Sequence, residues 1–208
     1  MAALATQADV EARLGRDLTE DEEARIEALL SDASELIRAH TGQDFDAVAD
    51  DAIVLRPVGV VLRLPQRPVT AVTSVHAVGR DGQADVELSG WSWDARDKVS
   101  LACATLSGAD VPTWWWGWGP DTYQVVYDHG YDPIPPIVVA TAATMVLRTL
   151  LSPSMATGMV SERIGAYNYQ LQQGAGSSGA AVVLTPPDEK ALARYGPRRA
   201  GVIQVRAG

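Results

Sequence analysis

Residues Val125 to Pro136 read V-V-Y-D-H-G-Y-D-P-I-P-P, and this stretch decides the fold because a strand gives way to a helix within it. The β-branched and aromatic residues at its start favour a strand, and Gly130 favours a tight turn. The two prolines at its end suit the first turn of a helix, where a missing N–H costs nothing. The helix that follows, Ile137 to Leu151, carries no charge before Arg148. Such a helix is apolar on nearly every side, so we expect it to be covered all round in a helical core.

Two more helices are predicted near the N-terminus. Thr6 is a typical N-cap for the first helix, which Gly15 ends. Thr19 begins the second helix, where Glu22 completes a capping box, and apolar residues at helical spacing continue to Gly42. The expected helical core therefore has two segments, 6–42 and 135–151.

A β-rich unit is predicted between these segments, at 53–127, where short apolar runs are separated by Pro and Gly. Arg80-Asp-Gly82 is typical of a hairpin turn. The single cysteine, Cys103, excludes a disulfide within the chain and a Cys-rich zinc site. It shares a face with Val99 and Leu101, so we expect a small buried side chain. The expected strands are Ile53–Leu55, Val60–Leu62, Val72–Val78, Val86–Leu88, Val99–Cys103 and Tyr123–Tyr127.

An extended arm is predicted at 155–183, where Gly, Ser, Ala and Gln predominate. Tyr167, Tyr169 and Leu171 alternate within it as in a strand, so the arm is expected to be extended or a hairpin. Its flexible tip, Gly174 to Gly179, matches the dinucleotide fingerprint G-x-G-x-x-G. No βαβ unit surrounds that match, so we interpret it as accidental.

A last helix and a tail are predicted at 185–208. Thr185 caps the helix, which is expected to reach Tyr195, and Val202 to Arg206 has the composition of one more strand. The predicted fold class is therefore α+β, with a small helical core, an inserted β-rich unit and an extended arm. All of these belong to a single expected domain, residues 1–208.

The net charge restricts the possible partners. The formal charge is −9, which argues against a groove that binds nucleic acid by neutralising phosphates. It is compatible with a surface that DNA passes without sticking, because like charges repel. The run Glu20 to Glu23 is either a solvated helix start or a surface that faces basic residues of a neighbour. No signal peptide or membrane-spanning run is found, so we expect a soluble protein of a reducing cytoplasm.

The sequence has no G-x-S-x-G nucleophile motif and no obvious base beside Cys103, so no enzyme activity and no cofactor are expected. Asp128, His129 and Asp132 could offer two carboxylates and an imidazole to a metal ion, as in a metal-dependent hydrolase. The alternative is a turn at a strand end, in which the Asp side chains bond the local backbone.

The tryptophans are the oddest local feature of the sequence. Trp114, Trp115, Trp116 and Trp118 follow one another closely, with Trp91 and Trp93 upstream. They could contact another protein, or stack on a sugar in a carbohydrate-binding β module. The simpler alternative is that their indoles fold back over the β unit.

Several motifs occur in the order found in one known family. The N-terminal helix pair is followed by R-P-V-T-A-V-T-S-V, V-V-Y-D-H-G-Y, P-P-I-V-V-A, S-E-R-I-G-A-Y-N-Y and L-T-P-P-D-E-K-A-L-A-R-Y. This series resembles the head-to-tail adaptor (connector, or head-completion) proteins of long-tailed phages, over nearly the whole chain. The most specific pieces are G-Y-x-x-x-P-P and S-E-R-I-G-A-Y-N-Y. The Trp114 to Trp118 loop does not match the family pattern.

The resemblance implies a structural virion protein without catalytic residues. It would form a ring of twelve copies beneath the portal, join the capsid to the tail, and leave a channel for the genome. Its implied partners are its own copies, the portal protein and a tail-side connector or tail terminator protein. Genomic DNA would pass without specific binding, no membrane would be involved, and assembly would occur in the host cytoplasm.

Two groups of residues are expected to serve this role. A Gly-rich extended segment cannot satisfy its own backbone, whereas the edge of a neighbour's sheet can pair with it, so the arm is expected to contact other copies. Glu162 and Arg163 could pair across such a contact or lie in solvent. The expected interface residues are Ser161, Glu162, Arg163, Ile164, Gly165, Tyr167, Tyr169, Trp115 and Trp116. The expected channel-lining residues are Glu20, Asp21, Glu22 and Glu23.

Overall fold

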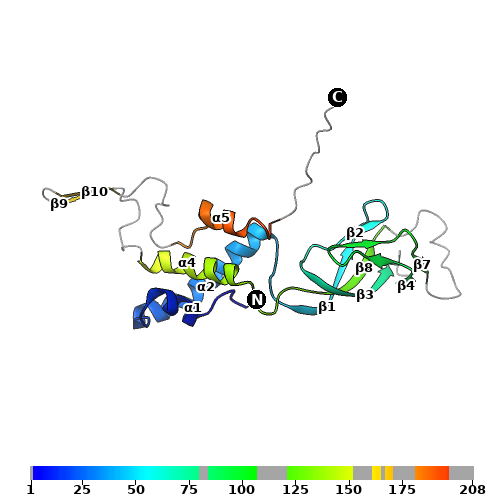
Figure 1. The fold of residues 1–208 in the computed structure, drawn as a ribbon, viewed down its shortest axis with the longest axis horizontal. Coiled ribbons are helices and arrows are strands. Elements are labelled where there is room, and N and C mark those ends of the chain that lie inside the picture. Colours follow the sequence, from blue (N-terminus) through cyan, green and yellow to red (C-terminus); the bar gives the residue numbers. More distant parts are fainter. Residues whose placement is uncertain are drawn as a thin grey trace, which may run out of the picture. The chain divides into compact units, whose positions relative to one another are not determined.

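The structure, a computed structural model, describes residues 2–79, 84–106, 121–151, 161–164, 167–170 and 181–196. It contains helices and antiparallel sheets, so the expected α+β class is confirmed (Figure 1). The chain forms two compact units, one from Met1–Gly42 with Pro135–Gly208 and one from Gln43–Ile134. We call them the helical unit and the β unit. Among the described helices, none has both the length and the apolar character needed to cross a membrane.

The first two helices have the boundaries that their caps predict. In α1 (Gln7–Leu14), Thr6 and Asp9 form a reciprocal capping box, and Gly15 ends the helix with a φ of 77°. In α2 (Glu20–Thr41), Thr19 and Glu22 form a second capping box. Hydrogen bonds from Thr6 lower the pKa of Asp9, because they favour its charged form. Local signals therefore suffice to place both helix starts.

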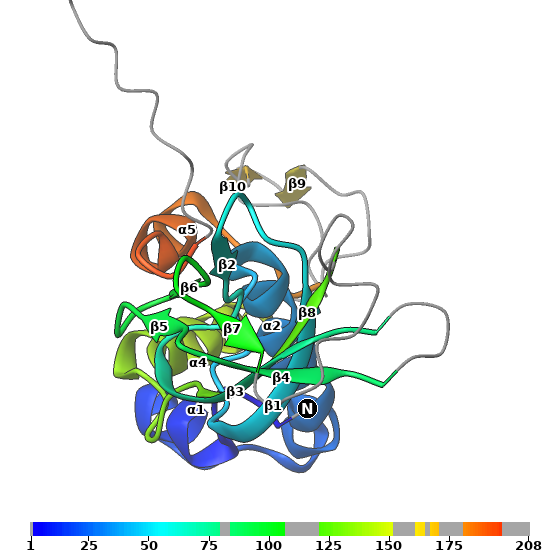
Figure 2. The same ribbon diagram turned by 90° about the vertical axis from the view of Figure 1, so that its right-hand side faces the viewer.

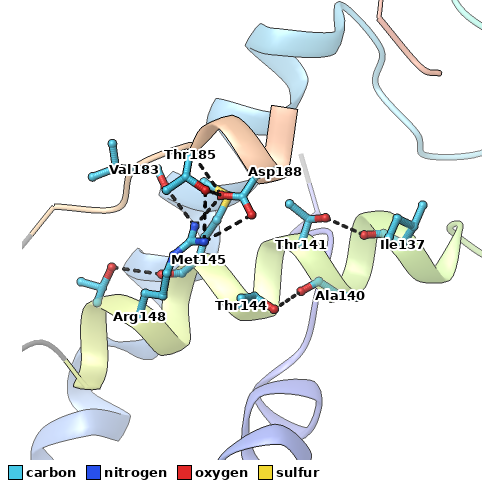
Figure 3. Close-up of polar contacts among 10 residues, drawn as sticks. Ile137, Ala140, Thr141, Thr144, Met145, Arg148, Val183, Thr185 and Asp188 are labelled. Atoms are coloured by element: carbon cyan, nitrogen blue, oxygen red, sulfur yellow. Dashed lines mark hydrogen bonds and ion pairs between the residues drawn. The ribbon is translucent and has the colours of Figure 1, made fainter. Parts of the chain in front are cut away.

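The apolar helix α4 (Pro136–Leu151) is the centre of the helical unit, where it packs against α1, α2 and α5 (Figure 1). Its middle is covered on all sides, but Ile137 and Leu151 are exposed near its two ends. The expected all-round covering therefore holds for the middle turns alone. Its three threonines each donate a hydroxyl hydrogen bond to the carbonyl four residues earlier, as Figure 3 shows for Thr141 and Thr144. An apolar helix can hold these hydroxyls because none needs an outside partner.

The last helix, α5 (Pro186–Leu192), is shorter than expected. Thr185 caps it, as predicted, and Asp188 completes a capping box. The expected extension to Tyr195 is wrong, because the backbone tightens after Leu192. Tyr195 N–H donates to Leu192 O at 2.8 Å, and Gly196 N–H donates to Ala193 O at 3.3 Å. Such three-residue spacings are typical of turns that close a helix end.

The described part of the β unit contains two antiparallel sheets. The larger has the order β1-β8-β3-β4-β7, and the smaller has the order β2-β6-β5 (Figure 2). The strands of the larger sheet are β1 (Val48–Leu55), β3 (Val69–Ala77), β4 (Val86–Ser89), β7 (Thr105–Leu106) and β8 (Tyr123–His129). The strands of the smaller sheet are β2 (Val61–Arg63), β5 (Ser92–Trp93) and β6 (Lys98–Ser100).

One apolar core serves both sheets. Every second residue of β8 is buried, namely Val125, Tyr127 and His129, as expected for a strand with one covered face. Leu62 of β2 and Val99 of β6 belong to the same buried cluster as Val125 and Tyr127. The two sheets therefore stabilise each other through shared side-chain packing.

Two expectations for the β unit are wrong. The strand expected at Val99–Cys103 ends at Ser100, where Ala104 N–H donates to Leu101 O at 3.0 Å and turns the chain. Cys103 is consequently exposed rather than buried. The antiparallel pairing of Ala77 with Val86 agrees with a β3–β4 hairpin, but the expected Arg80–Gly82 turn lies outside the described residues.

Candidate assembly surfaces

The arm contains a two-stranded hairpin at the place where the sequence predicts interface residues. Strands β9 (Ser161–Ile164) and β10 (Tyr167–Gln170) pair antiparallel. Their register puts Tyr167 opposite Ile164, and Tyr169 opposite Glu162. This sheet has two strands, so among the described residues the outer backbone edge of each strand is unpaired. Gly165, also expected at the interface, lies outside the described residues.

Hydrogen bonds from Arg148 connect α4 to the chain segment at the far end of the arm; we call this group of contacts the Arg148 base. Arg148, near the end of α4, donates from Nη2 to Asp188 Oδ2 at 2.5 Å and from Nη1 to Asp188 Oδ1 at 3.3 Å. It also donates to the Val183 carbonyl at 3.3 Å. Figure 3 shows this guanidinium between Val183, Thr185 and Asp188. Because Arg148 precedes the arm and Val183 is its last residue, these bonds hold the end of the arm against the helix that leads into it.

The contacts with Arg148 and Thr185 also change the ionisation of Asp188. Burial raises the pKa of this carboxyl, but hydrogen bonds from Arg148 and Thr185 outweigh burial, so the pKa lies below 3.8. Sequence reasoning missed this pair, although Arg148 is the first charge in the apolar helix and Asp188 completes a capping box. Those two signals marked the residues without showing that they meet.

The acidic start of α2 divides into two kinds of residue. Glu20, Asp21 and Glu23 are exposed. Glu22 instead accepts two hydrogen bonds from Arg16, at 2.7 and 2.8 Å, in addition to its capping bonds. The hydrogen bond from Arg16 is the main reason that the pKa of Glu22 falls to about 2. Of the four expected channel-lining residues, Glu22 therefore has a structural role of its own.

An open strand edge lies on the β unit. Strand β1 pairs with β8 at one side, and no described strand pairs with it at the other. From Asp51 to Leu55 its register with β8 is regular, so this part of β1 has no bulge. Val54 on this edge is 55 % exposed, and Val58 and Val60 just beyond it are 76 % and 54 % exposed.

The two segments that connect the β unit to the helices are fastened side by side at its base. Gln43 donates to Pro65 O at 3.0 Å and accepts from Arg67 N at 2.8 Å. Phe45 stacks on Tyr131 with ring centroids 6.2 Å apart, and Tyr131 N–H donates to Phe45 O at 3.0 Å. The entering and leaving strands therefore reach the β unit as a fixed pair.

The geometry does not favour the metal-site alternative at Asp128, His129 and Asp132. Asp128 accepts from the Asp50 N–H at 2.8 Å, and buried His129 contacts Asp51 at 3.2 Å. These are contacts between β8 and β1, rather than the local backbone bonds of the simpler alternative. Within the described part of the chain, no three His, Cys, Asp or Glu residues are grouped to hold a metal ion.

Two of the six tryptophans lie in described segments. Trp91 and Trp93 pack against the apolar core of the β unit. Their indole N–H groups donate to the carbonyls of Leu88 and Arg96, at 3.1 and 3.3 Å. These two indoles therefore follow the simpler alternative of folding over the β unit. Trp114 to Trp118, including the expected interface residues Trp115 and Trp116, lie outside the described residues.

Comparison with solved structures shows a likeness that covers nearly the whole chain. The fold is similar to that of a chain in the neck of an empty GTA (gene transfer agent) particle, whose structure was computed with C6 symmetry. The two chains are 16 % identical, with a TM-score of 0.50 and coverage of 97 % of this chain and 95 % of that chain. At this identity the likeness concerns the fold. No protein-family model matches the sequence, and no curated protein matches it.

Proposed function

We propose that this chain is a structural protein of the neck of a phage-like particle, where it acts as the head-to-tail adaptor. The observation that carries the proposal is the likeness to a neck chain over almost the full length of both chains. The ordered motifs of the sequence point independently to the same place. Copies of the chain would form a ring beneath the portal, join capsid to tail, and have no enzymatic role.

The copy number proposed for the ring is twelve. The neck structure of the gene transfer agent was computed with C6 symmetry, and twelve copies are compatible with a six-fold axis. Closed rings form when one surface of a subunit binds a different surface of the next, and the rotation returns to the start. The proposal therefore requires two distinct contact surfaces on every copy.

The arm is the first such surface that we propose. A hairpin of two short strands is marginally stable in water on its own, so β9–β10 gains stability from a partner. The Arg148 base fixes where the arm leaves the helical unit. The exposed acidic residues at the start of α2 would face the channel, where negative charge lets DNA pass without binding.

The test is assembly with the portal protein of the same particle. We expect purified full-length protein mixed with portal rings to add a second ring, visible in negative-stain images. A deletion of Ser161 to Leu171 should leave a folded monomer that does not join the portal. A control deletion of Gly174 to Gly179, at the predicted tip, should still join. Normal decoration of portals by the first deletion would contradict the proposed role of the arm.

A further inference from the structure

The β1 edge needs an explanation that the proposed function does not supply. Natural proteins protect edge strands with charges, prolines or bulges, because unpaired N–H and C=O groups invite another strand. The first half of β1 has such protection, since its register shifts between Val48 and Asp51 and Asp50 has a φ of 53°. The second half, Asp51 to Leu55, has regular pairing with β8 on its inner side, and Val54 within it is exposed.

Apolar exposure is concentrated beside this unprotected half. Of the eight large hydrophobic residues that are exposed in the described chain, three lie between Val54 and Val60. Val58 and Val61 exchange backbone hydrogen bonds at 2.9 and 3.3 Å, so this turn is folded while its side chains stay exposed. An apolar surface at an open sheet edge is typical of a contact between proteins.

The β9–β10 hairpin and the β1 edge each have unpaired backbone groups that the other could pair with. Strands β9 and β10 have four residues each, which matches the five-residue regular part of β1. The hairpin has a free edge and too few strands to be stable alone, and β1 has a free edge on a stable sheet. Each chain thus has one donor and one acceptor, which differ from each other. This is the arrangement that produces rings rather than two-fold dimers.

The reach of the arm allows contact with another copy. Nine residues lie between Leu151 and Ser161, which is ten steps along the chain, and ten residues lie between Gln170 and Ala181. Ten extended residues span at most roughly 33 Å, which exceeds the radius of gyration of a domain of 100 residues, about 13 Å. The hairpin can therefore extend well beyond its own helical unit.

We propose that the β9–β10 hairpin of one copy pairs with the β1 edge of the next copy, at Asp51 to Leu55, and extends its five-stranded sheet. The inference rests on the proposed ring, because it assigns the second surface that a ring needs. The occupant of the edge is a second copy of this chain. The exposed valines beside β1 cover the face of the added hairpin.

The test uses two proteins with one cysteine each. Cys103 is exposed, so both proteins carry Cys103→Ser to remove the native thiol. One protein carries Val54→Cys and the other carries Gln170→Cys or Ser161→Cys, because either hairpin strand can be the one that pairs. Neighbouring strands bring Cβ atoms to about 4.5–5.5 Å, close enough for a disulfide after small movement. Mixed, mildly oxidised samples, with and without portal rings, are separated on a non-reducing gel.

A disulfide-linked heterodimer is expected for one of the two hairpin positions, and it can form only between different chains. The matched control is Thr73→Cys, an exposed position on the central strand β3 of the same sheet. A heterodimer yield no higher than that of the control would overturn the inference. Val54→Cys homodimers alone would also overturn it, because they would show β1 pairing with β1.

A second variant separates this inference from the proposed function. Val54→Lys adds an edge charge that disfavours strand addition and leaves the core untouched. We expect a folded monomer that fails to form rings, with Thr73→Lys as the control that still forms them. If Val54→Lys forms rings on the portal, the edge pairing is wrong and the adaptor role stands. If the unmodified protein never joins the portal, the adaptor role is wrong.

Discussion

Arg148 and Asp188 are forty residues apart in the chain, and their Nη2 and Oδ2 atoms lie 2.5 Å apart. This pair is partly shielded from solvent, because the Asp188 side chain is 10 % exposed and the Arg148 side chain is 40 % exposed. It differs from most surface ion pairs because the same carboxylate also caps α5. Loss of the guanidinium therefore affects the helix start and the base of the arm together.

Arg148→Met should destabilise the helical unit by about 1–3 kcal/mol, the range for a buried polar group that loses a partner. Methionine keeps the apolar stem, so the loss reports the hydrogen bonds. Urea unfolding followed by circular dichroism measures the change. Arg25→Met, at an exposed position of α2, is the control and should change stability little. Equal stability of both variants would show that the Arg148 bonds contribute nothing.

The stabilisation from Asp188 should depend on pH in the acid range. The folded-state pKa of Asp188 lies below 3.8, so the charged carboxyl stabilises the fold above that pH. This contribution is lost as pH falls from the unfolded pKa through the folded pKa. The free energy of unfolding should therefore differ between wild type and Asp188→Asn at neutral pH, and the difference should shrink in that acid range. If the difference in unfolding free energy between wild type and Asp188→Asn does not vary with pH, the stabilising role of the charged Asp188 carboxyl is wrong.

Tyr127→Phe should leave stability unchanged or raise it. The ring is fully buried, and its hydroxyl has no hydrogen-bond partner among the described residues, although Asp51 and the Gln66 backbone lie near it. Burial and the nearby Asp51 charge raise the pKa of Tyr127 to about 12. Removal of an unpaired hydroxyl leaves no broken bond behind. Tyr127→Ala should instead cost about 3–5 kcal/mol, because it empties the core. A large loss in Tyr127→Phe would reveal a partner for the hydroxyl.

Gly130→Ala should prevent stable folding of the β unit, whereas Gly59→Ala should be tolerated. Both glycines have a positive φ, of 100° and 64°. A Cβ on Gly130 would overlap the backbone carbonyl of Asp46, whereas a Cβ on Gly59 would meet nothing nearby. The second change should cost about 1–2 kcal/mol from the backbone conformation alone. Thermal unfolding of both variants distinguishes the effect of the overlap from that of the φ angle.

Replacement of Glu20, Asp21 and Glu23 by Lys, with Glu22 retained, should slow genome ejection without unfolding the protein. The three residues are exposed, and Glu22 keeps its bonds to Arg16 and Thr19. Positive charge in a channel would attract the phosphates of passing DNA. The effect should weaken at high salt, because salt screens exposed charges. Ejection at the normal rate would argue against a channel position for the start of α2.

Sequence signals gave the helix starts, because each capping box lies within four residues of chain. Thr6, Thr19 and Thr185 cap their helices as expected. The same local reasoning failed where an outcome depends on distant segments. Nothing near Cys103 shows that the chain turns after Ser100, and nothing near Val54 shows that β1 is at a sheet edge.

Of the candidate assembly surfaces, the strands of the arm could be predicted from the sequence, but the Arg148–Asp188 contact could not. The alternation of Tyr167 and Tyr169 indicated a strand, and the structure has a hairpin there. The base that Arg148 and Asp188 form could not be found, because their contact depends on how α5 packs on α4. Strand order and helix packing are tertiary properties, so composition and periodicity do not contain them.

The stacked pair Phe45 and Tyr131 has a consequence for how this chain can be rebuilt. A chain that departs from a fold and rejoins it at one point can acquire, exchange or discard the intervening module without rerouting the remainder. The region between Gly42 and Pro135 can therefore be exchanged as one module, while the chain on either side of it keeps its course.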